Sequence, residues 1–316
     1  MDITVVVPLL NEAESLPELC SRIKAVMENH SFSYEILMID DGSTDSSWEC
    51  LCGLAKSDPC IHGIRFRRNY GKSAALYCGF EKARGEVVVT MDADLQDAPE
   101  EIPELYRMVT EEDYDLVSGW KRRRKDNALT KNLPSKLYNA TARLITGIKL
   151  HDMNCGLKAY RKDVVKSVEV YGEMHRYIPY LAKNAGFTRI GEKEVHHEKR
   201  KYGKSKFGVE RFVNGFLDLQ SLWFLSTFGK KPMHFFGFSG LVMFLAGFVM
   251  TVWIIAAKLV HQASGVRFRA VTEQPLFYLA LLCVVLGVML FLAGLLGEMI
   301  ARSAPERNSY NIKEEL

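Results

Sequence analysis

The sequence predicts an α/β domain with a mostly parallel sheet, followed by two membrane-spanning helices. Up to about residue 230, short runs of β-branched residues alternate with helix-like segments, and this alternation is typical of a parallel sheet covered by helices. Beyond that point, residues 234–257 and 275–297 contain no Asp, Glu, Lys or Arg. Each stretch is long enough to cross a bilayer core of about 30 Å as a helix. A buried soluble hairpin is the less favoured alternative.

Composition and flanking charges narrow the class of protein. The chain has 316 residues, 48% of them hydrophobic, and a formal charge of +3, so we expect neither a disordered protein nor a nucleic-acid partner. Its seven cysteines, an odd number, do not make a disulfide framework. We expect no signal peptide before the first strand, because Met1-Asp2 leads directly into it without a basic segment. Lysines before the first span and arginines after the second favour both chain ends inside, although the intervening loop also carries two arginines.

The predicted strands follow one another in a regular β/α order. Each is a short apolar run that stops at a polar cluster. A helix opened by Ser15 follows the first strand, and another helix spans 99–110. The expected strands are 3–7, 34–39, 61–66, 87–91, 115–119 and 188–195.

Polar clusters follow the predicted strands where ligands bind in open α/β sheets, at the carboxyl ends. After the strand at 87–91 come Asp92, Asp94 and Gln96. Two carboxylates and an amide suit Mg²⁺, which completes its shell with substrate phosphates. The alternative is a solvated turn in which Asp97 or a neighbour caps the next helix.

A second signal precedes the helix after the third strand. Gly71 and Lys72 stand at its start, and a helix N-terminus with Gly and Lys can hold a phosphate. The spacing is not that of a P-loop, so an ATPase is not predicted.

Several motifs in this order resemble the GT-A (Rossmann-like) inverting glycosyltransferases of family 2. Within that family the chain resembles the polyprenyl-phosphate glycosyltransferases, which include relatives of dolichol-phosphate mannose synthase and bacterial undecaprenyl-phosphate glucosyl and aminoarabinosyl transferases. The resemblance runs from the first strand through both spans. The motifs are Pro8-x-x-Asn11-Glu12, Asp40-Asp41-Gly42-Ser43-x-Asp45, Asn69-x-Gly71-Lys72, Asp92-Ala93-Asp94-Leu95-Gln96, Asp152-Met153-Asn154-Cys155-Gly156-Leu157-Lys158 and Arg200-x-x-Gly203-x-Ser205-Lys206.

The resemblance implies roles for individual residues. Nucleotide-sugar binding is implied for Pro8, Leu10, Glu12, Asp41, Asn69, Lys72 and Asp92. Binding of Mg²⁺ or Mn²⁺ is implied for Asp92, Asp94 and Gln96, and catalytic roles are implied for Asp152 and Asp94. Binding of the acceptor or of phosphate is implied for Lys131, Ser135, Arg200, Lys204 and Lys206. Lys131 departs from relatives that carry Arg, so a point charge replaces a bidentate fork.

The chemistry leaves the role of Asp152 open. A polyprenyl monophosphate has a second pKa near 6 and is mostly a dianion at neutral pH, so it needs little help from a general base. Asp152 is therefore either a base or an orienting group. The charge on the leaving nucleotide diphosphate must be stabilised, which a metal can do. The donor and the acceptor are both anions, and fixed cations are needed to bring them together.

Other basic residues have a second interpretation. The run 121–125 is as well explained by attraction to anionic lipid headgroups. His196 and His197 are adjacent strand residues that point to opposite faces, so they are not expected to ligate one ion. His175 and Arg176 are interpreted as structural.

Residues 209–228 are amphipathic and predict a helix lying in the bilayer interface. The spans have repeated glycines that allow close helix contacts. We expect a catalytic domain at 1–208, an interface segment at 209–232, a transmembrane hairpin at 233–300 and a cytoplasmic tail at 301–316. The resemblance implies a multi-pass protein of the inner (plasma) membrane with a cytoplasmic catalytic domain, and an oligomer, a tetramer in relatives.

The sequence therefore predicts transfer of one sugar from a nucleotide sugar, with UDP favoured by the resemblance, to polyprenyl (undecaprenyl) phosphate. Two alternatives are a processive polysaccharide synthase and a non-catalytic membrane scaffold. The first usually needs more spans and a Gln-x-x-Arg-Trp motif that the sequence lacks. Neither the sugar nor the acceptor chain length follows from the sequence.

Overall fold

The computed structural model divides the chain into two compact units, Met1–Gln220 and Ser221–Leu316. Each is considered by itself. The structure describes residues 1–122, 143, 146–170, 172, 174–198, 201, 224, 228, 232–264 and 269–303. Outside the described residues lie most of the predicted interface segment, nearly all of the tail, and the predicted acceptor-binding residues Lys131, Ser135, Arg200, Lys204 and Lys206.

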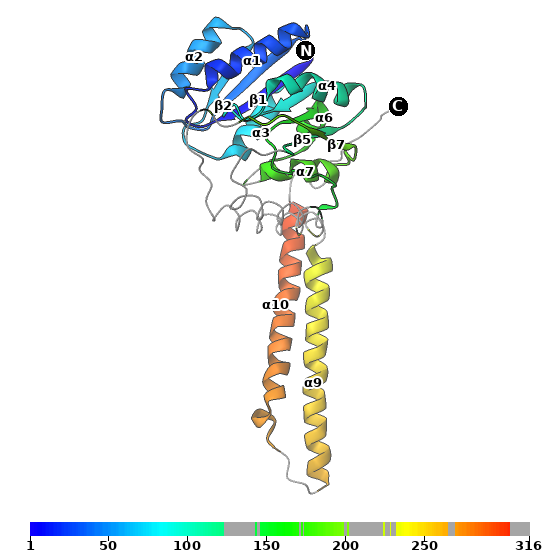
Figure 1. Cartoon of the computed structure of the whole chain (residues 1–316). Helices are drawn as coiled ribbons and strands as arrows, with labels where there is room; N and C mark the ends of the chain where they lie inside the picture. The colour runs from blue at the N-terminus through cyan, green and yellow to red at the C-terminus, as the bar shows by residue number, and fades with distance from the viewer. Residues whose placement is uncertain are drawn as a thin grey trace. The chain divides into compact units, whose positions relative to one another are not determined.

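The first unit is built on a seven-stranded sheet with the order β3-β2-β1-β4-β6-β5-β7 (Figure 1). β6 runs antiparallel to both of its neighbours, and the other pairs are parallel. The mostly parallel sheet is thus confirmed, and β6 is the strand that the apolar pattern did not predict. The strands are β1 Ile3–Leu9, β2 Tyr34–Asp40, β3 Ile61–Arg65, β4 Val87–Thr90, β5 Leu116–Trp120, β6 Lys158–Arg161 and β7 Ile190–Glu194.

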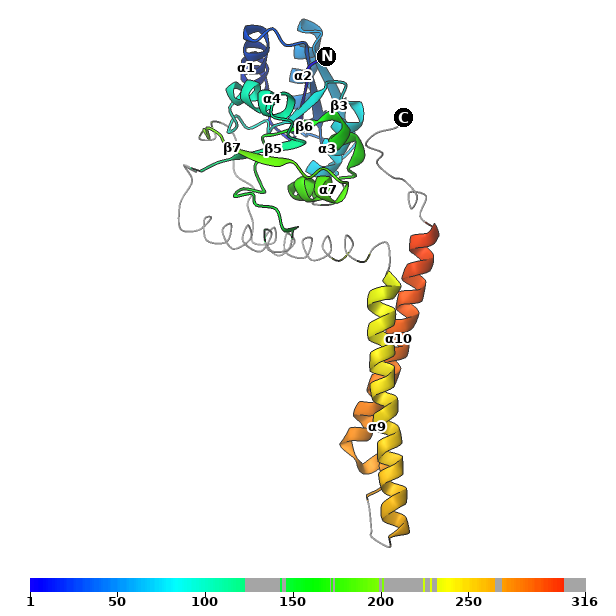
Figure 2. The same ribbon diagram turned by 90° about the vertical axis from the view of Figure 1, so that its right-hand side faces the viewer.

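Helices cover both faces of the sheet. α1, α2 and α4 lie on one side, and α3 and α6 on the other (Figures 1 and 2). The helix predicted at 99–110 is a 3₁₀ turn, η1, that continues into α4. The bounds are α1 Leu16–Asn29, α2 Ser47–Ser57, α3 Lys72–Lys82, η1 Pro99–Glu101, α4 Ile102–Thr110, α6 Lys162–Ser167, η2 Met174–Tyr177 and α7 Ile178–Asn184.

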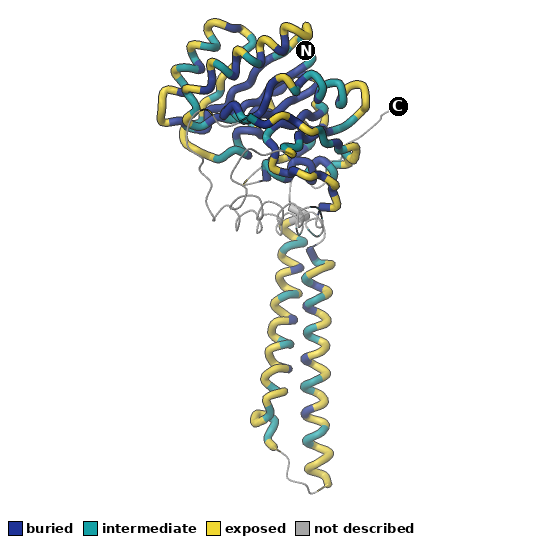
Figure 3. Tube along the Cα trace, in the orientation of Figure 1, coloured by how far each residue is buried: buried dark blue, intermediate teal, exposed yellow. Residues whose placement is uncertain are grey.

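The core explains why β1 is apolar at nearly every position. Val5 and Val7 belong to the cluster that includes Leu19 of α1, whereas Val6 faces α3. A Cβ on Gly79 of α3 would lie 2.3 Å from Val6 Cγ1, so glycine lets this helix pack directly on the strand. Figure 3 shows the strands as mostly buried residues, and in β1 every residue but Pro8 is buried, which is typical of a parallel strand covered on both faces.

The second unit is a hairpin of two long helices, α9 (Phe238–Ala263) and α10 (Pro275–Ser303). A π-helical turn, η3 (Met233–Gly237), precedes α9, and a 3₁₀ turn, η4 (Val271–Glu273), precedes α10. Met233–Ala263 and Pro275–Ile300 are long and apolar enough to cross a membrane, with mean hydropathies of 2.3 and 2.9.

Glycines bring the two helices of the hairpin together. A Cβ on Gly240 would lie 2.6 Å from the Gly287 carbonyl oxygen, and one on Gly247 would lie 2.6 Å from that of Ala280. The predicted close contacts are therefore made within the hairpin. The surface that remains is largely exposed and apolar (Figure 3), which suits association with a membrane.

Candidate active site

Polar groups from three strands gather at one edge of the sheet. β1, β2 and β4 run parallel, and the register pairs Pro8 with Ile39 and Val6 with Thr90. The residues that follow these strands, among them Asp41 and Asp92, therefore lie at the same edge. This is where the sequence placed the ligand cleft.

Asp41 shapes the loop that leads into α3. Its carboxylate is buried and accepts hydrogen bonds from the backbone N–H groups of Tyr70 (2.7 Å) and Gly71 (2.9 Å). Gly42 has φ +74°, and a Cβ there would lie 2.6 Å from the carbonyl carbon of Arg68. The Asp41-Gly42 turn thus holds the segment that carries Asn69 and Lys72.

The loop after β1 is tied to the loop after β2. The backbone N–H of Asn11 donates to the Ser43 hydroxyl, and that of Glu12 donates to the Ser47 hydroxyl, both at 2.9 Å. The Asn11 side chain in turn accepts from the Thr44 N–H at 2.8 Å. Pro8, Leu10 and Glu12 are therefore carried by a loop that is fixed to the end of β2.

Asp92 is the predicted metal residue that lines the cleft itself. Burial opposes its ionisation, but the charges of Lys72 and Lys121 outweigh this and hold its pKa well below the ordinary range. The Lys72 ammonium makes an ion pair with its carboxylate. A carboxylate that is held ionised in this way is a suitable ligand for Mg²⁺ or Mn²⁺.

The next residues form a tight turn. Asp94 is buried, and its Oδ1 accepts a hydrogen bond from the Gln96 N–H at 3.1 Å. Leu95 between them is fully buried with φ +58°, a left-handed conformation that costs about 1 kcal/mol or more outside glycine. Such strain is concentrated at functional sites, where the surrounding structure enforces it.

Asp97 does not cap the following helix. The cap residues of η1 and α4 are Ala98 and Glu101. Asp97 is instead fully buried and forms an ion pair of 2.6 Å with Lys121, whose side chain is 12% exposed. Burial lowers the pKa of Lys121, but Asp97 together with the other acidic groups around it, among them Asp92, outweighs burial, and the net shift is upward. Lys121 therefore supports the Asp92–Gln96 loop from within and does not face lipid headgroups.

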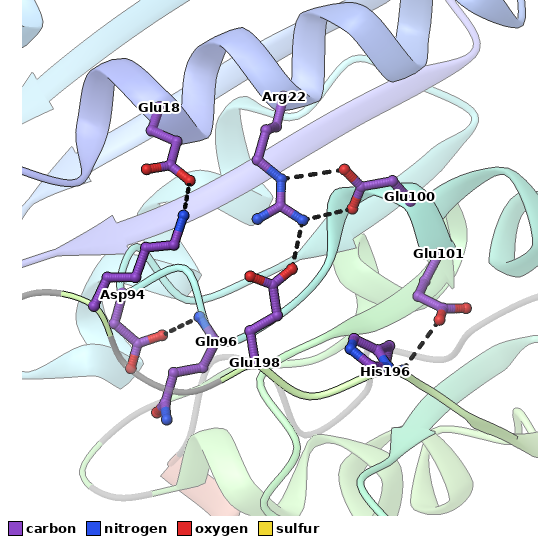
Figure 4. A network of polar contacts seen from close by, with 9 residues as sticks. Glu18, Arg22, Asp94, Gln96, Glu100, Glu101, His196 and Glu198 are labelled. Carbon is purple, nitrogen blue, oxygen red and sulfur yellow. Dashed lines mark hydrogen bonds and ion pairs between the residues drawn. The ribbon is translucent and has the colours of Figure 1, made fainter. Parts of the chain in front are cut away.

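The segment after β7 runs along the same loop (Figure 4). The backbone N–H of Glu198 donates to the Gln96 carbonyl at 3.0 Å. His197 is buried, and its backbone forms an isolated antiparallel β-bridge with that of Asp97. Arg22 on α1 ties this segment down through Glu198 and also binds Glu100, at 2.8 Å each. The turn that carries Asp94 is thus held from two sides.

The loop of the second acidic motif lies against Asp92. A Cβ on Gly156 would be only 2.6 Å from Asp92 Oδ2, and the Thr90 hydroxyl donates to the Gly156 carbonyl at 2.9 Å. Asp152 itself is buried, and its Oδ1 accepts from the Asn154 N–H at 3.1 Å. Two motifs about sixty residues apart in sequence therefore form one site.

Three basic residues that sequence reasoning did not assign to the site also line the cleft: Lys158, His175 and Arg176. Lys158 is 3% exposed, and its ammonium donates to the Cys155 carbonyl. Burial, together with the charge of Lys72, lowers its pKa. The backbone N–H of His175 donates to the Ser73 hydroxyl at 3.0 Å. The one available signal was that Lys158 closes the second acidic motif of the sequence.

The donor set suits a metal that is shared with a ligand. Among the described residues, no group of three or more His, Cys, Asp or Glu side chains is placed to enclose an ion. Asp92 and Asp94 supply two carboxylates at one strand end, which fits Mg²⁺ or Mn²⁺ completed by phosphate oxygens and water.

Comparison with known proteins matches nearly the whole chain. It is 33% identical over 305 residues to the dodecaprenyl-phosphate galacturonate synthase of Rhizobium johnstonii, covering 96% of this chain and 88% of the relative. It is 37% identical over 302 residues to the undecaprenyl-phosphate 4-deoxy-4-formamido-L-arabinose transferase of Shewanella sediminis, covering 95% and 87%.

Solved structures share the fold at low identity. Mannosyl-3-phosphoglycerate synthase from Rubrobacter xylanophilus has a TM-score of 0.58 at 16% identity, covering 71% of this chain and 74% of that one. Glucosyl-3-phosphoglycerate synthase from Mycobacterium tuberculosis, in complex with Mn²⁺, UDP-glucose and phosphoglyceric acid, has a TM-score of 0.54 at 18% identity, covering 70% and 80%. The predicted GT-A fold is confirmed.

The strand ends and the loops between them also match a family model. The model described as glycosyl transferase family 2 covers residues 4–168, which is more than half of the chain and includes β1 to β6 with every acidic motif of the cleft. The chain therefore belongs to glycosyl transferase family 2 and is a glycosyltransferase.

Proposed function

We propose that the enzyme transfers a single sugar from a nucleotide sugar, with UDP favoured, to polyprenyl (undecaprenyl) phosphate at the inner face of the membrane. The observation that carries the proposal is the contact of Gly156 with Asp92. It places the loop of Asp152 beside the loop of Asp94, so a donor and an acceptor can meet there. Relatives named for dodecaprenyl- and undecaprenyl-phosphate match over at least 95% of this chain.

In this proposal the donor lies along the strand ends. Pro8, Leu10, Glu12 and Asp41 hold the nucleoside, and Asn69 and Lys72 lie near its phosphates. Mg²⁺ or Mn²⁺, held by Asp92, Asp94 and Gln96 together with the diphosphate, would stabilise the charge that develops on the leaving group. In this proposal the Lys72 ammonium pairs with the Asp92 carboxylate only while no donor is bound.

Asp152 serves the reacting centre. An acceptor phosphate oxygen forms a bond to the anomeric carbon while the bond from that carbon to the nucleotide diphosphate breaks, with inversion. Asp152 orients the acceptor, takes up its proton when the acceptor arrives as a monoanion, and stabilises positive charge at the sugar ring. Lys131, Ser135, Arg200, Lys204 and Lys206 are proposed to bind the acceptor phosphate.

The hairpin anchors this chemistry at the bilayer. With α9 and α10 in the membrane and the catalytic domain in the cytoplasm, the isoprenoid stays in lipid and presents only its phosphate. We place the end of the catalytic domain at residue 208, the end of the interface segment at residue 232 and the end of the transmembrane hairpin at residue 300. That the protein forms a homo-oligomer stays a prediction. The hairpin glycines named above do not support it, because each already contacts the other helix of the same hairpin.

The reaction is tested with full-length protein in detergent, undecaprenyl phosphate, Mg²⁺ or Mn²⁺, and a panel of nucleotide sugars. Mass spectrometry should show a lipid that gains one sugar. Asp94→Ala should lower the rate by about 1,000-fold, whereas Asp163→Ala, which removes a carboxylate that is 70% exposed, should not. Nucleotide binding without any lipid product from the whole panel would contradict the proposal.

A further inference from the structure

A carboxylate on the edge strand β7 holds the loop of the second acidic motif. Glu192 Oε1 accepts hydrogen bonds from the backbone N–H groups of His151 (2.8 Å) and Asp152 (3.1 Å). Its Oε2 lies 2.7 Å from His151 Nδ1. The side chain is only 12% exposed. One carboxylate from a strand forty residues away thus binds two successive peptide groups of the loop.

The other side of His151 is also fixed. Its ring stacks on Trp120 of β5, with centroids 4.3 Å apart and planes 17° from parallel. β5 and β7 are paired in parallel, and Glu192 is in register with Ser118. His151, the residue before Asp152, is therefore held between a side chain of β7 and a ring of β5.

This arrangement determines where the Asp152 carboxylate lies. Fixing the peptide on its amino side fixes the backbone of Asp152, and the hydrogen bond of Asp152 Oδ1 with the Asn154 N–H fixes the side chain. Both Glu192 oxygens bind the loop, so this carboxylate acts on the site through the loop.

We propose that Glu192 is a positioning residue that sets the Asp152 carboxylate for reaction. The inference rests on the proposed function, in which Asp152 serves the reacting centre. A misplacement of about 1 Å can cost 100-fold in rate, and a loop without this anchor is free to move by that much.

The experiment compares Glu192→Ala, Glu192→Gln and Glu194→Ala in the full-length enzyme. Glu192→Ala should lower kcat by about 10- to 100-fold with little change in the KM for the donor. Glu192→Gln should keep most of the activity, because its amide oxygen can still accept both backbone N–H bonds. Glu194 lies on the same side of β7 and pairs with Arg122 at an exposed site, so Glu194→Ala is the matched control.

A double variant separates positioning from a general structural role. In an Asp152→Asn background, Glu192→Ala should cause no further loss, because the group that it positions is already changed. A loss by the same factor as in the wild type would overturn the proposal, as would an unchanged kcat in Glu192→Ala alone.

Amide hydrogen exchange tests the same contact without turnover. Peptides that contain His151 and Asp152 should exchange faster in Glu192→Ala and at the wild-type rate in Glu192→Gln and Glu194→Ala. Unchanged exchange in Glu192→Ala would overturn the inference. This measurement decides it even if the lipid reaction fails, so the two failures can be told apart.

Discussion

Two buried charges at opposite ends of the sheet, Glu35 and Lys158, are satisfied to different degrees. At the amino end, Glu35 of β2 is 1% exposed, and its carboxylate accepts hydrogen bonds from the Thr4 hydroxyl (2.7 Å) and from Arg84 Nε (2.7 Å) and backbone N–H (2.9 Å). Every oxygen is occupied. At the carboxyl end, Lys158 is similarly buried, but no ion pair to it is found among the described residues, and its ammonium donates to one backbone carbonyl.

The difference separates structure from function within one sheet. A closed network such as that of Glu35 satisfies buried polar groups and can stabilise the fold. An ammonium with hydrogen bonds left to donate is costly to bury, and such groups are concentrated where a ligand completes the site. We therefore expect substitutions at the carboxyl end to affect activity and those at the amino end to affect stability.

Among the substitutions that test this comparison, Gly156→Ala is expected to have the largest effect. The new Cβ would lie 2.6 Å from Asp92 Oδ2, so the carboxylate must turn away from its position. This should lower kcat by about 100-fold, with little change in melting temperature because a short side chain can rotate.

Gly53→Ala is its matched control. Nothing lies within 4 Å of a Cβ on this glycine of α2, and alanine favours a helix. Full activity in Gly156→Ala would show that the position of the Asp92 carboxylate does not matter, and would remove the distinction between the two ends of the sheet.

Lys158→Met should separate activity from stability. Removing the buried charge eliminates a desolvation cost, so the melting temperature should stay the same or rise. The rate should fall by about 10- to 100-fold if the ammonium binds the donor or acceptor. Steady-state rates and thermal unfolding of the detergent-purified protein measure both. A less stable but fully active variant would make Lys158 a structural residue.

The carboxyl end was also easier to predict from the sequence than what surrounds it. Apolar runs that stop at Asp41 and Asp92 predict parallel strands with a cleft at their ends, because strand ends and ligand sites coincide in this kind of sheet. β6 was not predicted, since two of its four residues, Lys158 and Arg161, are charged. The insertion of an antiparallel strand between β4 and β5 depends on tertiary structure, and no local sequence pattern indicates it.

The missed residues of the site have the same cause. His175 reaches the cleft because η2 packs near α3, and no spacing in the sequence announces that contact. The position of Asp97 before a helix predicts a helix cap, whereas its ion pair with Lys121 follows only from the folded structure. Residue types predict chemistry, whereas partners from distant segments depend on the assembled sheet.

A smaller effect, confined to stability, is expected for Glu35→Ala. The change leaves the Thr4 hydroxyl without its acceptor, at a cost of about 2 kcal/mol, and the Arg84 backbone N–H keeps only its bond of 3.2 Å to Thr4 Oγ1. Thermal unfolding should show the loss, and kcat should stay at the wild-type value. Glu49→Ala, on the exposed surface of α2, controls for the loss of a carboxylate. A fall in kcat with unchanged stability would reverse the comparison.

The smallest effect is the pH dependence of that stabilisation. Burial raises the pKa of Glu35, but the hydrogen bonds from Arg84 and Thr4 outweigh it, and the net pKa lies below its ordinary value. A carboxylate whose pKa is lowered by folding stabilises the protein above its unfolded pKa, near 4.3, and loses this contribution as the pH falls through its folded pKa. The difference in melting temperature between wild type and Glu35→Gln should therefore be complete at pH 7 and smaller at pH 4. An equal or larger difference at pH 4 would mean that the charge of Glu35 adds nothing to the closed network, and that its stabilisation comes from hydrogen bonds that a neutral side chain can also make.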